Sequence, residues 1–271
     1  MTTKTCNKRI YYTSLDGNII TPYNGSIFGV NIISNVYANG QGVLTFDDDI
    51  TLIGEWAFFN CSNLTSVIIP NSVTKIGSHA FFRCKKLTSV IIPDSVTSIG
   101  DSAFFGCSNL TSITIPQNTT SIGEKAFSLC SGELIINCNI PRAMLYSCSV
   151  FTPAFSAFPE HNHYDYLSGF SKITIGDTVT KIGAWAFKCC NCLTSVTIGN
   201  GVTSIGNAAF LGCHNLTSVY CKAITPPTED GCLFLNIASV RKIYVPRESV
   251  KAYKSAKGWS EYAKDIVGYD F

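Results

Sequence analysis

Hydrophobic and polar positions recur along the chain with a period of about 23 residues. One unit, read from Ile53, has the pattern Ile-Gly-x-x-Ala-Phe-x-x-Cys-x-x-Leu-Thr-Ser-Val-x-Ile-Pro-x-x-Val-Thr-x. A fixed period of this size is typical of repeat proteins, in which each unit packs only against its neighbours. The pattern therefore predicts a stack of about nine coils. Clear copies begin at Ile53, Ile76, Ile99, Ile122, Ile182 and Ile205, and degenerate copies keep the strand phase at Leu44 and Phe46, Ile173 and Ile175, and Ile243 and Val245.

The second half of each unit predicts a β-strand. Leu64, Val67 and Ile69 follow the spacing Leu-x-x-Leu-x-Leu, which turns three apolar side chains inward. Ser66 and Ile68 then alternate outward. A single coil cannot bury its apolar side, so the strands of successive coils must stack in parallel.

The first half of each unit predicts a short helical or 3₁₀ turn on the side opposite the strand. The segment from Gly54 to Cys61 contains Ala57 and Phe58 and has no β-branched residue. We expect Phe58 and its equivalents to form an inner aromatic ladder, Gly54 to adopt a positive φ, and Pro70 to end the strand. These features predict a right-handed leucine-rich-repeat solenoid, of the α/β class by convention, with parallel strands and short helical or 3₁₀ turns.

Both ends of the chain depart from the repeat, as the caps of a solenoid must. Near the N-terminus, the segments 11–13 and 19–21 flank Leu15-Asp16-Gly17-Asn18, which predicts a hairpin turn in a cap that spans residues 10–49. Near the C-terminus, residues 248–256 predict a helix, with Gly258 as its stop and Trp259 as an apolar plug. The expected organisation is an N-terminal cap with a first degenerate coil (1–49), a repeat array with an irregular insertion at 137–169 (50–235), and a last strand with a helical C-terminal cap (236–271).

The composition indicates a well-buried chain with little charge. Apolar residues make up 46% and charged residues 14%, and the formal net charge is +2. No basic block is long enough to follow a phosphate backbone, so we expect no nucleic-acid partner. No run of about 18 apolar residues predicts a membrane span, and no secretion signal is visible, so we expect a soluble monomer. The sequence predicts no cofactor.

The cysteines follow the repeat. Thirteen cysteines in a chain of this size would suggest disulfides, but most occupy one equivalent position in successive coils. Free cysteine packs as a small apolar group, so this spacing favours a ladder of buried thiols. Cys189 and Cys192 have Cys-x-x-Cys spacing, which we interpret as exposed or incidentally oxidised thiols and not as a zinc or redox site. The ladder positions are Cys61, Cys84, Cys107, Cys130, Cys190 and Cys213.

The repeat units resemble the BspA-type leucine-rich-repeat family, a group of bacterial surface and secreted proteins also found in some mucosal protists. The residues that carry the resemblance are Ile-Gly-x-x-Ala-Phe-x-x-Cys and Leu-Thr-Ser-Val/Ile-x-Ile-Pro in segments 76–98 and 99–121. The segment 241–259 is similar to the closing segment of repeat proteins from gut anaerobes. The resemblance covers nearly the whole chain except the insertion. It implies a cell-surface or extracellular location and binding of host proteins, with fibronectin and fibrinogen as partner types, and it brings no catalytic residues.

Two groups of residues are candidates for binding. The outward strand positions form an uncharged array that suits a peptide or an extended protein surface, although strand propensity alone also explains small side chains there. The insertion carries His-x-His with flanking tyrosines, which suits a recognition loop better than a metal site because a metal needs at least three convergent ligands. The candidates are Ser66, Ile68, Ser89, Ile91, Ser112, Thr114, Ser195, Thr197, Ser218 and Tyr220 on strands, and His161, His163, Tyr164 and Tyr166 in the insertion.

A second array follows the core phenylalanines. Consecutive aromatic residues cannot both point inward, so part of the ring area of these residues is either exposed or packed against neighbouring coils. The array consists of Phe59, Phe82, Phe105 and Leu211.

The function that these patterns favour is a non-catalytic protein-recognition or adhesion module, displayed on or secreted from a host-associated bacterium. The catalytic motifs G-x-S-x-G, G-x-G-x-x-G, His-Glu-x-x-His and the Walker loop are absent from the sequence, so we expect no enzyme. Its partner is expected to be a protein of the host extracellular matrix or of another cell surface. The alternative is a structural spacer, whose coils set a distance between other modules and bind no specific ligand.

Overall fold

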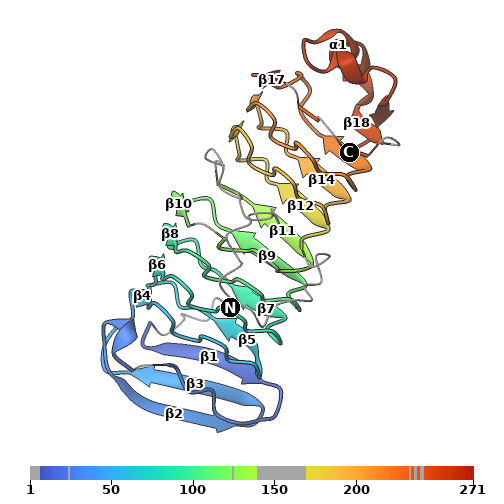
Figure 1. Cartoon of the computed structure of the whole chain (residues 1–271). Helices are drawn as coiled ribbons and strands as arrows, with labels where there is room; N and C mark the ends of the chain where they lie inside the picture. Colours follow the sequence, from blue (N-terminus) through green and yellow to red (C-terminus); the bar gives the residue numbers. More distant parts are fainter. Residues whose placement is uncertain are drawn as a thin grey trace, which may run out of the picture. The chain divides into compact units, whose positions relative to one another are not determined.

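The computed structural model describes residues 7–23, 25–123, 125–138, 169–231, 233–234, 237–238 and 241–271. The chain divides into two compact units, residues 1–139 (unit 1) and 140–271 (unit 2), and each is described by itself. In both units, coils stack through parallel strands, and equivalent residues of most neighbouring coils are 23 positions apart, which confirms the predicted leucine-rich-repeat solenoid (Figure 1). There is little helix in the described residues.

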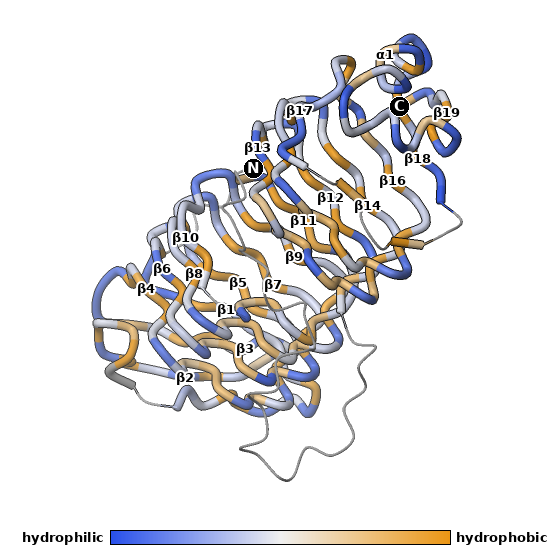
Figure 2. The backbone as a smooth tube through the Cα atoms, turned by 45° about the horizontal axis from the view of Figure 1, so that its top comes forward, coloured by the Kyte–Doolittle hydropathy of each residue, from blue (hydrophilic) through white to orange (hydrophobic). Residues whose placement is uncertain are grey.

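Each coil contributes one longer strand to a parallel sheet. Val67 pairs in register with Val90 in unit 1, and Val196 pairs with Val219 in unit 2. The inward residues of these strands are buried, and Figure 2 shows hydrophobic positions recurring along them. Among the described residues there are eight such strands, β5 (Leu64–Ile68), β7 (Ser89–Ile91), β9 (Ser112–Ile115) and β11 (Glu133–Ile136) in unit 1, and β12 (Lys172–Ile175), β14 (Ser195–Ile198), β16 (Ser218–Cys221) and β18 (Lys242–Pro246) in unit 2.

A second set of two-residue strands was not predicted. These strands occupy the start of each repeat, where Ile53 pairs with Ile76 and Ile76 pairs with Ile99. They form separate parallel sheets in each unit. The strands are β4 (Leu52–Ile53), β6 (Lys75–Ile76), β8 (Ser98–Ile99) and β10 (Ser121–Ile122) in unit 1, and β13 (Lys181–Ile182), β15 (Ser204–Ile205) and β17 (Thr228–Glu229) in unit 2.

The segment from Gly54 to Cys61 forms consecutive turns, so the prediction of a helical or 3₁₀ turn was wrong. Trp56 and Asn60 have φ values of 64° and 54°, whereas a helix needs negative φ throughout. The backbone N–H of Phe59 donates to Trp56 O within the coil (3.0 Å), but that of Asn60 donates to Phe82 O in the next coil (2.7 Å). A helix would satisfy both N–H groups inside one coil, whereas here one of them joins two coils.

The glycine at the second repeat position is required by close packing and not by backbone conformation. Gly77 and Gly100 do not have the predicted positive φ. A Cβ added to Gly77 would lie 2.6 Å from Glu55 N, and one added to Gly100 would lie 2.5 Å from Ser78 N. Each glycine therefore allows its coil to lie directly against the backbone of the preceding coil.

The predicted inner aromatic ladder is confirmed. In unit 1 the rings of Phe81 and Phe104 are 5.0 Å apart and nearly parallel, and Phe104 stacks in the same way on Phe127 at 5.5 Å. In unit 2, Phe187 stacks on Phe210 at 5.1 Å. All of these side chains are fully buried, so the ladder fills the centre of each stack.

The cysteine ladder is also confirmed as free thiols, and all of its members except half-buried Cys61 are buried. The thiols of Cys84, Cys107, Cys130 and Cys213 each lie against the carbonyl group of a core phenylalanine in the preceding coil. Cys84 Sγ donates to Phe58 O at 3.0 Å, and Cys107 Sγ donates to Phe81 O at 3.2 Å. The thiol thus satisfies a carbonyl group that a purely apolar side chain would leave without that donor.

These thiols are expected to resist alkylation in the folded protein. Burial raises the pKa of Cys61 to about 11 and raises the pKa of Cys107 well above its usual value of 9.0. Because the thiolate is the reactive form, iodoacetamide at pH 8 should modify Cys107 rapidly only after unfolding in urea, as measured by peptide mass spectrometry. Equal labelling of Cys107 in native and unfolded protein would contradict this account. The raised pKa values also predict a loss of stability as the pH rises above 9.0.

Threonines at the coil corners form further ladders between coils. Thr88 Oγ1 donates to Thr65 O at 3.0 Å, and Thr97 Oγ1 donates to Thr74 O at 3.2 Å, each across 23 residues. These hydroxyls therefore bind the preceding coil, in addition to any effect of β propensity. Equivalent bonds are made by Thr74, Thr111, Thr119, Thr120, Thr194, Thr203 and Thr217.

The N-terminal cap is an antiparallel sheet, and the predicted hairpin at residues 15–18 was wrong. β1 (Arg9–Ser14) lies between β3 (Gln41–Phe46) and β5, and it is antiparallel to both. β2 (Ile32–Ala38) forms the hairpin with β3, and Asn39 and Gly40 make the turn with φ values of 52° and 79°. Leu44 and Phe46 therefore belong to the cap and not to a degenerate coil. A 3₁₀ helix, Gly25–Phe28, lies in the connection between β1 and β2.

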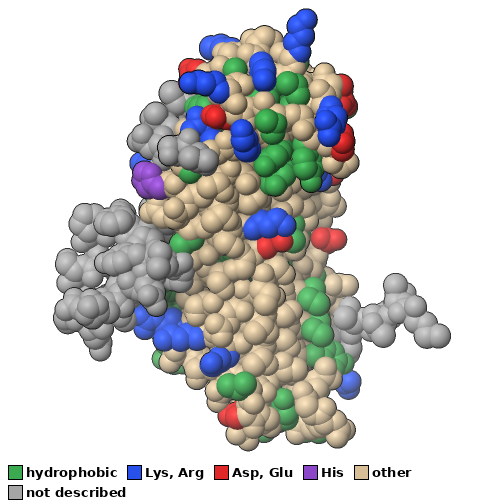
Figure 3. All heavy atoms as spheres, turned by 90° about the vertical axis from the view of Figure 1, so that its right-hand side faces the viewer, with side chains coloured by type: hydrophobic (Ala, Val, Ile, Leu, Met, Phe, Trp, Pro, Cys, Tyr) green, Lys and Arg blue, Asp and Glu red, His purple; other side chains and the backbone are tan. Residues whose placement is uncertain are grey.

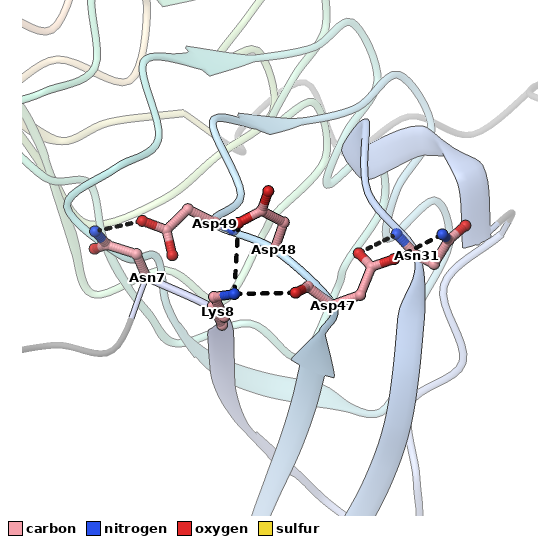
Figure 4. Close-up of polar contacts among 6 residues, drawn as sticks. All are labelled: Asn7, Lys8, Asn31, Asp47, Asp48 and Asp49. Atoms are coloured by element: carbon pink, nitrogen blue, oxygen red, sulfur yellow. Dashed lines mark hydrogen bonds and ion pairs between the residues drawn. The ribbon is translucent and has the colours of Figure 1, made fainter.

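Hydrogen bonds and an ion pair between polar side chains connect the residues just before β1 with those just after β3 (Figure 4). Lys8 Nζ donates to Asp47 O at 3.0 Å and lies 3.5 Å from Asp48 Oδ1. Asn31 donates through its backbone and side-chain nitrogens to the Asp47 carboxylate at 2.9 and 2.7 Å, and these bonds lower the pKa of Asp47. Asn7 Nδ2 donates to Asp49 Oδ2 at 3.2 Å. The acidic groups here are thus engaged in closing the cap.

The helical C-terminal cap is confirmed. A 3₁₀ turn (Arg247–Ser249) leads into α1 (Val250–Ser255), and Gly258 follows with a φ of 74°. Trp259 is fully buried, and its Nε1 donates to Pro227 O at 2.9 Å. A second 3₁₀ turn (Ser260–Tyr262) leads to β19 (Ile266–Tyr269), which pairs in parallel with β18 and was not predicted.

Candidate binding surface

The predicted outward residues of unit 1 lie in rows across the strands, and we call the outward side of the longer strands the strand face. Ser66 lies opposite Ser89, and Ile68 lies opposite Ile91. Ile91 is 57% exposed although the next inward residue, Val90, is buried. The predicted outward residues of unit 1 are Ser66 and Ile68 on β5, Ser89 and Ile91 on β7, and Ser112 and Thr114 on β9.

The cap strand β1 lies beside β5 in the sheet, and its side chains partly bury the outward residues of β5. Tyr11 on β1 is the register partner of Ile68, and Thr13 Oγ1 lies 2.7 Å from Ser66 Oγ. Ser66 and Ile68 are consequently half-buried, whereas Ser89, Ser112 and Thr114 are exposed. The accessible part of the predicted array in unit 1 therefore lies on β7 and β9.

Unit 2 continues the same pattern with different side chains. Ser195 lies opposite Ser218, and Thr197 lies opposite Tyr220. Tyr220 in turn lies opposite Tyr244 on β18, and their rings stack at 4.5 Å with an interplanar angle of 10°. The alternation that placed Tyr220 outward extends to Tyr244, which the predicted set omitted.

Tyr220 and Tyr244 belong to a larger aromatic cluster. The ring of Tyr269, on β19, meets both of them edge-on at 5.6 and 5.4 Å, and Phe271 meets Tyr269 at 5.1 Å. Tyr269 and Phe271 are 42% and 51% exposed. Because β19 follows the cap helix and was not predicted, no repeat pattern pointed to these two residues.

The strand face is not uncharged, which corrects the prediction. Glu133 begins β11 in unit 1, and Lys172 and Lys242 begin β12 and β18 in unit 2. These positions lie in the same phase as the outward serines, since Lys172 and Lys242 are register partners of Ser195 and Ser218. On the side shown in Figure 3, most of the surface is nevertheless formed by backbone or by side chains that are neither hydrophobic nor charged.

The other predicted sites lie either outside the described residues or away from the strand face. His161, His163, Tyr164 and Tyr166 fall outside the described residues. Cys189 and Cys192 are half-buried and form no disulfide. Within the described part of the chain, no three His, Cys, Asp or Glu side chains are grouped to hold a metal ion, and no helix has the length and apolarity to cross a membrane.

The second aromatic array packs along the turn segments of unit 1. Phe82 stacks between Phe59 and Phe105 at 5.3 and 4.9 Å, and all three rings are half-buried. Beside them, Trp56 stacks on His79 at 4.1 Å, and burial lowers the pKa of His79. Packing between neighbouring coils thus accounts for much of this array.

The repeat sequences match a known family along most of the chain. The model of the BspA type leucine-rich-repeat region matches residues 31–150 and 160–256 in six copies. The chain belongs to the BspA-type leucine-rich-repeat family. Members of this class are typically binding modules without catalysis. Comparison with curated proteins found no significant match.

Leucine-rich-repeat proteins of known structure are similar to this chain. A leucine-rich-repeat protein of T. pallidum is 22% identical, with a TM-score of 0.42 and coverage of 82% of this chain and 80% of that protein. One from Bacteroides ovatus is 20% identical, with a TM-score of 0.33 and coverage of 89% and 74%. A leucine-rich cell surface protein of Faecalibacterium prausnitzii is 22% identical, with a TM-score of 0.29 and coverage of 82% and 77%. The assignment to the family rests on the repeat match.

Proposed function

We propose that this BspA-type protein is a non-catalytic recognition module of the bacterial surface or exterior, and that it binds a protein partner through the strand face of unit 1. The observation that supports the proposal is the exposure of Ile91, at 57%, among the exposed small residues Ser89, Ser112 and Thr114. An apolar side chain with uncharged neighbours costs little to desolvate when a partner covers it.

The parallel strands also hold this surface in one geometry. Ile91 is in register with Ile68, and Thr88 Oγ1 and Thr111 Oγ1 each donate to the carbonyl group of the preceding coil. A surface that is already ordered loses little conformational entropy on binding. This arrangement suits an extended partner surface that lies across several coils.

A charge placed on the strand face tests the proposal. Ile91→Glu and Thr114→Lys are each expected to weaken binding at least about tenfold, because a partner would bury an unpaired charge. Immobilised fibronectin and fibrinogen, the partner types that the family resemblance implies, serve as probes in surface plasmon resonance. Asn71→Glu and Asn71→Lys add the same charges at an exposed corner and should leave binding unchanged.

The outcomes separate recognition from a spacer role. Unchanged affinity of Ile91→Glu and Thr114→Lys, with native circular dichroism, would remove the strand face of unit 1 from the mechanism. If the unmodified chain binds neither probe nor any component of a matrix extract, the spacer is favoured. Ladders such as Thr88 to Thr65, which join successive coils, would suit that role as well.

A further inference from the structure

The aromatic cluster of unit 2 ends in a ring with one uncovered face. Tyr220 and Tyr244 are register partners on adjacent strands, and their rings are parallel and 4.5 Å apart. Strands in a sheet are about 4.8 Å apart, so the two rings stand upright on the sheet with their faces turned along the stack of strands. One face of Tyr220 therefore contacts Tyr244, and the opposite face looks toward β14.

The neighbour on that side is too small to cover the ring. Thr197 on β14 is the register partner of Tyr220, and Thr174 on β12 is the register partner of Thr197. Among the described residues, the rings in contact with Tyr220 are those of Tyr244 and Tyr269, and Tyr269 approaches at 73°. The surface therefore drops from the ring of Tyr220 to the small side chains beside it. We call this feature the step and the open face of the Tyr220 ring its wall.

The floor of the step is lined with hydroxyl groups. Ser195, Thr197 and Ser218 are half-buried outward residues on β14 and β16. Each hydroxyl both donates and accepts hydrogen bonds, as the hydroxyls of a sugar do. Wall and floor together thus offer one apolar face beside several small polar groups.

Two ammonium groups flank the wall. Lys222 follows Tyr220 by two residues on the outward side of its strand, where Lys222 N continues the ladder to Ile198 O at 2.9 Å. Lys242 precedes Tyr244 by two residues and is exposed. Two residues of a strand span about 6.6 Å, so each lysine lies close to the ring pair.

The charge of this region favours an anion. Neither Lys222 nor Lys242 has an ion pair within the described part of the chain. The nearby Arg241 and Arg247 are paired with Asp265 and Asp270 at 2.9 and 2.6 Å. The outward positions of β14, β16 and β18 carry no acidic residue. Figure 3 shows basic groups around a cluster of hydrophobic side chains on this side of the molecule.

From this arrangement we propose that the step at Tyr220 is a binding site for a polysaccharide that carries carboxylate groups, a chain that contains uronic acids. The C–H face of a pyranose ring lies against the open face of Tyr220, the sugar hydroxyls bond to the serine and threonine floor, and a carboxylate pairs with Lys222 or Lys242. Two separate lysines match sparse carboxylates better than a dense run of sulfates. The site goes beyond the proposed protein recognition by unit 1 and does not depend on it.

Binding of four polymers to the whole chain tests the proposal. Hyaluronan carries one carboxylate for every two sugars, dextran has sugars without charge, poly-L-glutamate has carboxylates without sugars, and dextran sulfate has sugars with dense sulfates and no carboxylates. We expect biolayer interferometry at about 0.15 M salt to show binding to hyaluronan at least tenfold stronger than to each of the other three. Equal or stronger binding of poly-L-glutamate, dextran or dextran sulfate, or no binding of hyaluronan, would overturn the proposal.

Variants then locate the site. Tyr220→Ala is expected to weaken hyaluronan binding at least tenfold, whereas Tyr220→Phe, which keeps the ring, should stay within about threefold of the unmodified chain. The double variant Lys222→Ala/Lys242→Ala should also lose at least tenfold, while Lys251→Ala/Lys254→Ala, which removes two exposed charges from α1, should not. Hyaluronan binding that survives both Tyr220→Ala and the first double variant would overturn the site.

The two proposals can fail separately. Ile91→Glu lies in unit 1 and is expected to leave hyaluronan binding unchanged, and Tyr220→Ala is expected to leave binding to the protein probes unchanged. Loss of hyaluronan binding in Ile91→Glu, with native circular dichroism, would contradict the assignment to Tyr220. Tyr220→Phe keeps the stack with Tyr244, so it provides a measurement in case Tyr220→Ala disturbs the fold.

Discussion

Phe104→Ala is expected to lower the free energy of unfolding by about 3–5 kcal/mol, the usual cost of removing a fully buried phenylalanine ring. Phe104 lies between the rings of Phe81 and Phe127, at 5.0 and 5.5 Å, and none of its surface is exposed. The backbone of the flanking coils is held by hydrogen bonds between coils, so the cavity cannot collapse easily. Urea denaturation followed by circular dichroism measures the effect as a shift of the midpoint.

Phe105→Ala is the matched control. It removes the same ring from the next residue, but Phe105 is half-buried and stacks on Phe82 on the outer side of the turn segment. We expect it to cost about 1–2 kcal/mol, because less apolar surface is returned to water. If the two variants were equally stable, the inner ladder would not be the centre of the core.

Gly100→Ala is expected to cost about 3 kcal/mol or more, although it adds a single methyl group. The new Cβ would lie 2.5 Å from Ser78 N, 2.8 Å from the Gly77 carbonyl carbon and 2.9 Å from Ser78 Cα. All three are backbone atoms, so no flexible side chain can move aside. The two coils would have to separate, which would weaken the bond from Gly100 N to Ile76 O at 2.8 Å. Thermal and urea unfolding both report the change.

Gly40→Ala is the control for Gly100→Ala, because it measures the cost of backbone strain without a steric clash. Gly40 has a φ of 79° in the β2–β3 turn, and a Cβ there meets nothing within 4 Å. Its expected cost is about 1 kcal/mol, from the left-handed conformation alone. A Gly100→Ala protein as stable as Gly40→Ala would show that the coils tolerate a wider spacing at this position.

The longer strands were predictable because their pattern is both local and repeated. Leu64, Val67 and Ile69 alternate with outward residues, and the same order returns in most of the clear coils. The alternation was also sufficient to place the outward rows from Ser66 to Tyr220. Applied to β18 it would have included Tyr244, so this omission was avoidable.

Elements formed by contacts between coils were not predictable in the same way. The pair Lys75–Ile76 is too short for a period-two pattern, and it becomes a strand only because the neighbouring coils supply partners. The segment 54–61 has a helix-compatible composition, but bonds such as Asn60 N to Phe82 O hold it in alternating turns. Local propensity pointed to the wrong structure there because stacking satisfies half of the N–H groups.

The caps show that an alternating strand pattern does not determine how a strand pairs with its neighbours. Leu44 and Phe46 alternate like a repeat strand, and alternation does not distinguish parallel from antiparallel pairing. The Asn39-Gly40 dipeptide is a strong hairpin signal and would have placed β2 and β3 correctly. Tyr269 joins the aromatic cluster only through tertiary packing of β19 on β18, so its place on the strand face had no signal in the sequence.

The offset of 23 residues that most of the threonine ladder keeps limits how the gene can change length. Duplicating or deleting one whole repeat leaves every remaining threonine facing an equivalent carbonyl group, so the array can grow or shrink without new contacts having to evolve. A change of any other length has to be absorbed within one coil, as it is between β9 and β11, which pair across 21 residues, and between β16 and β18, which pair across 24. Lineages that carry this fold should therefore differ by complete units, with irregular additions confined to bulges.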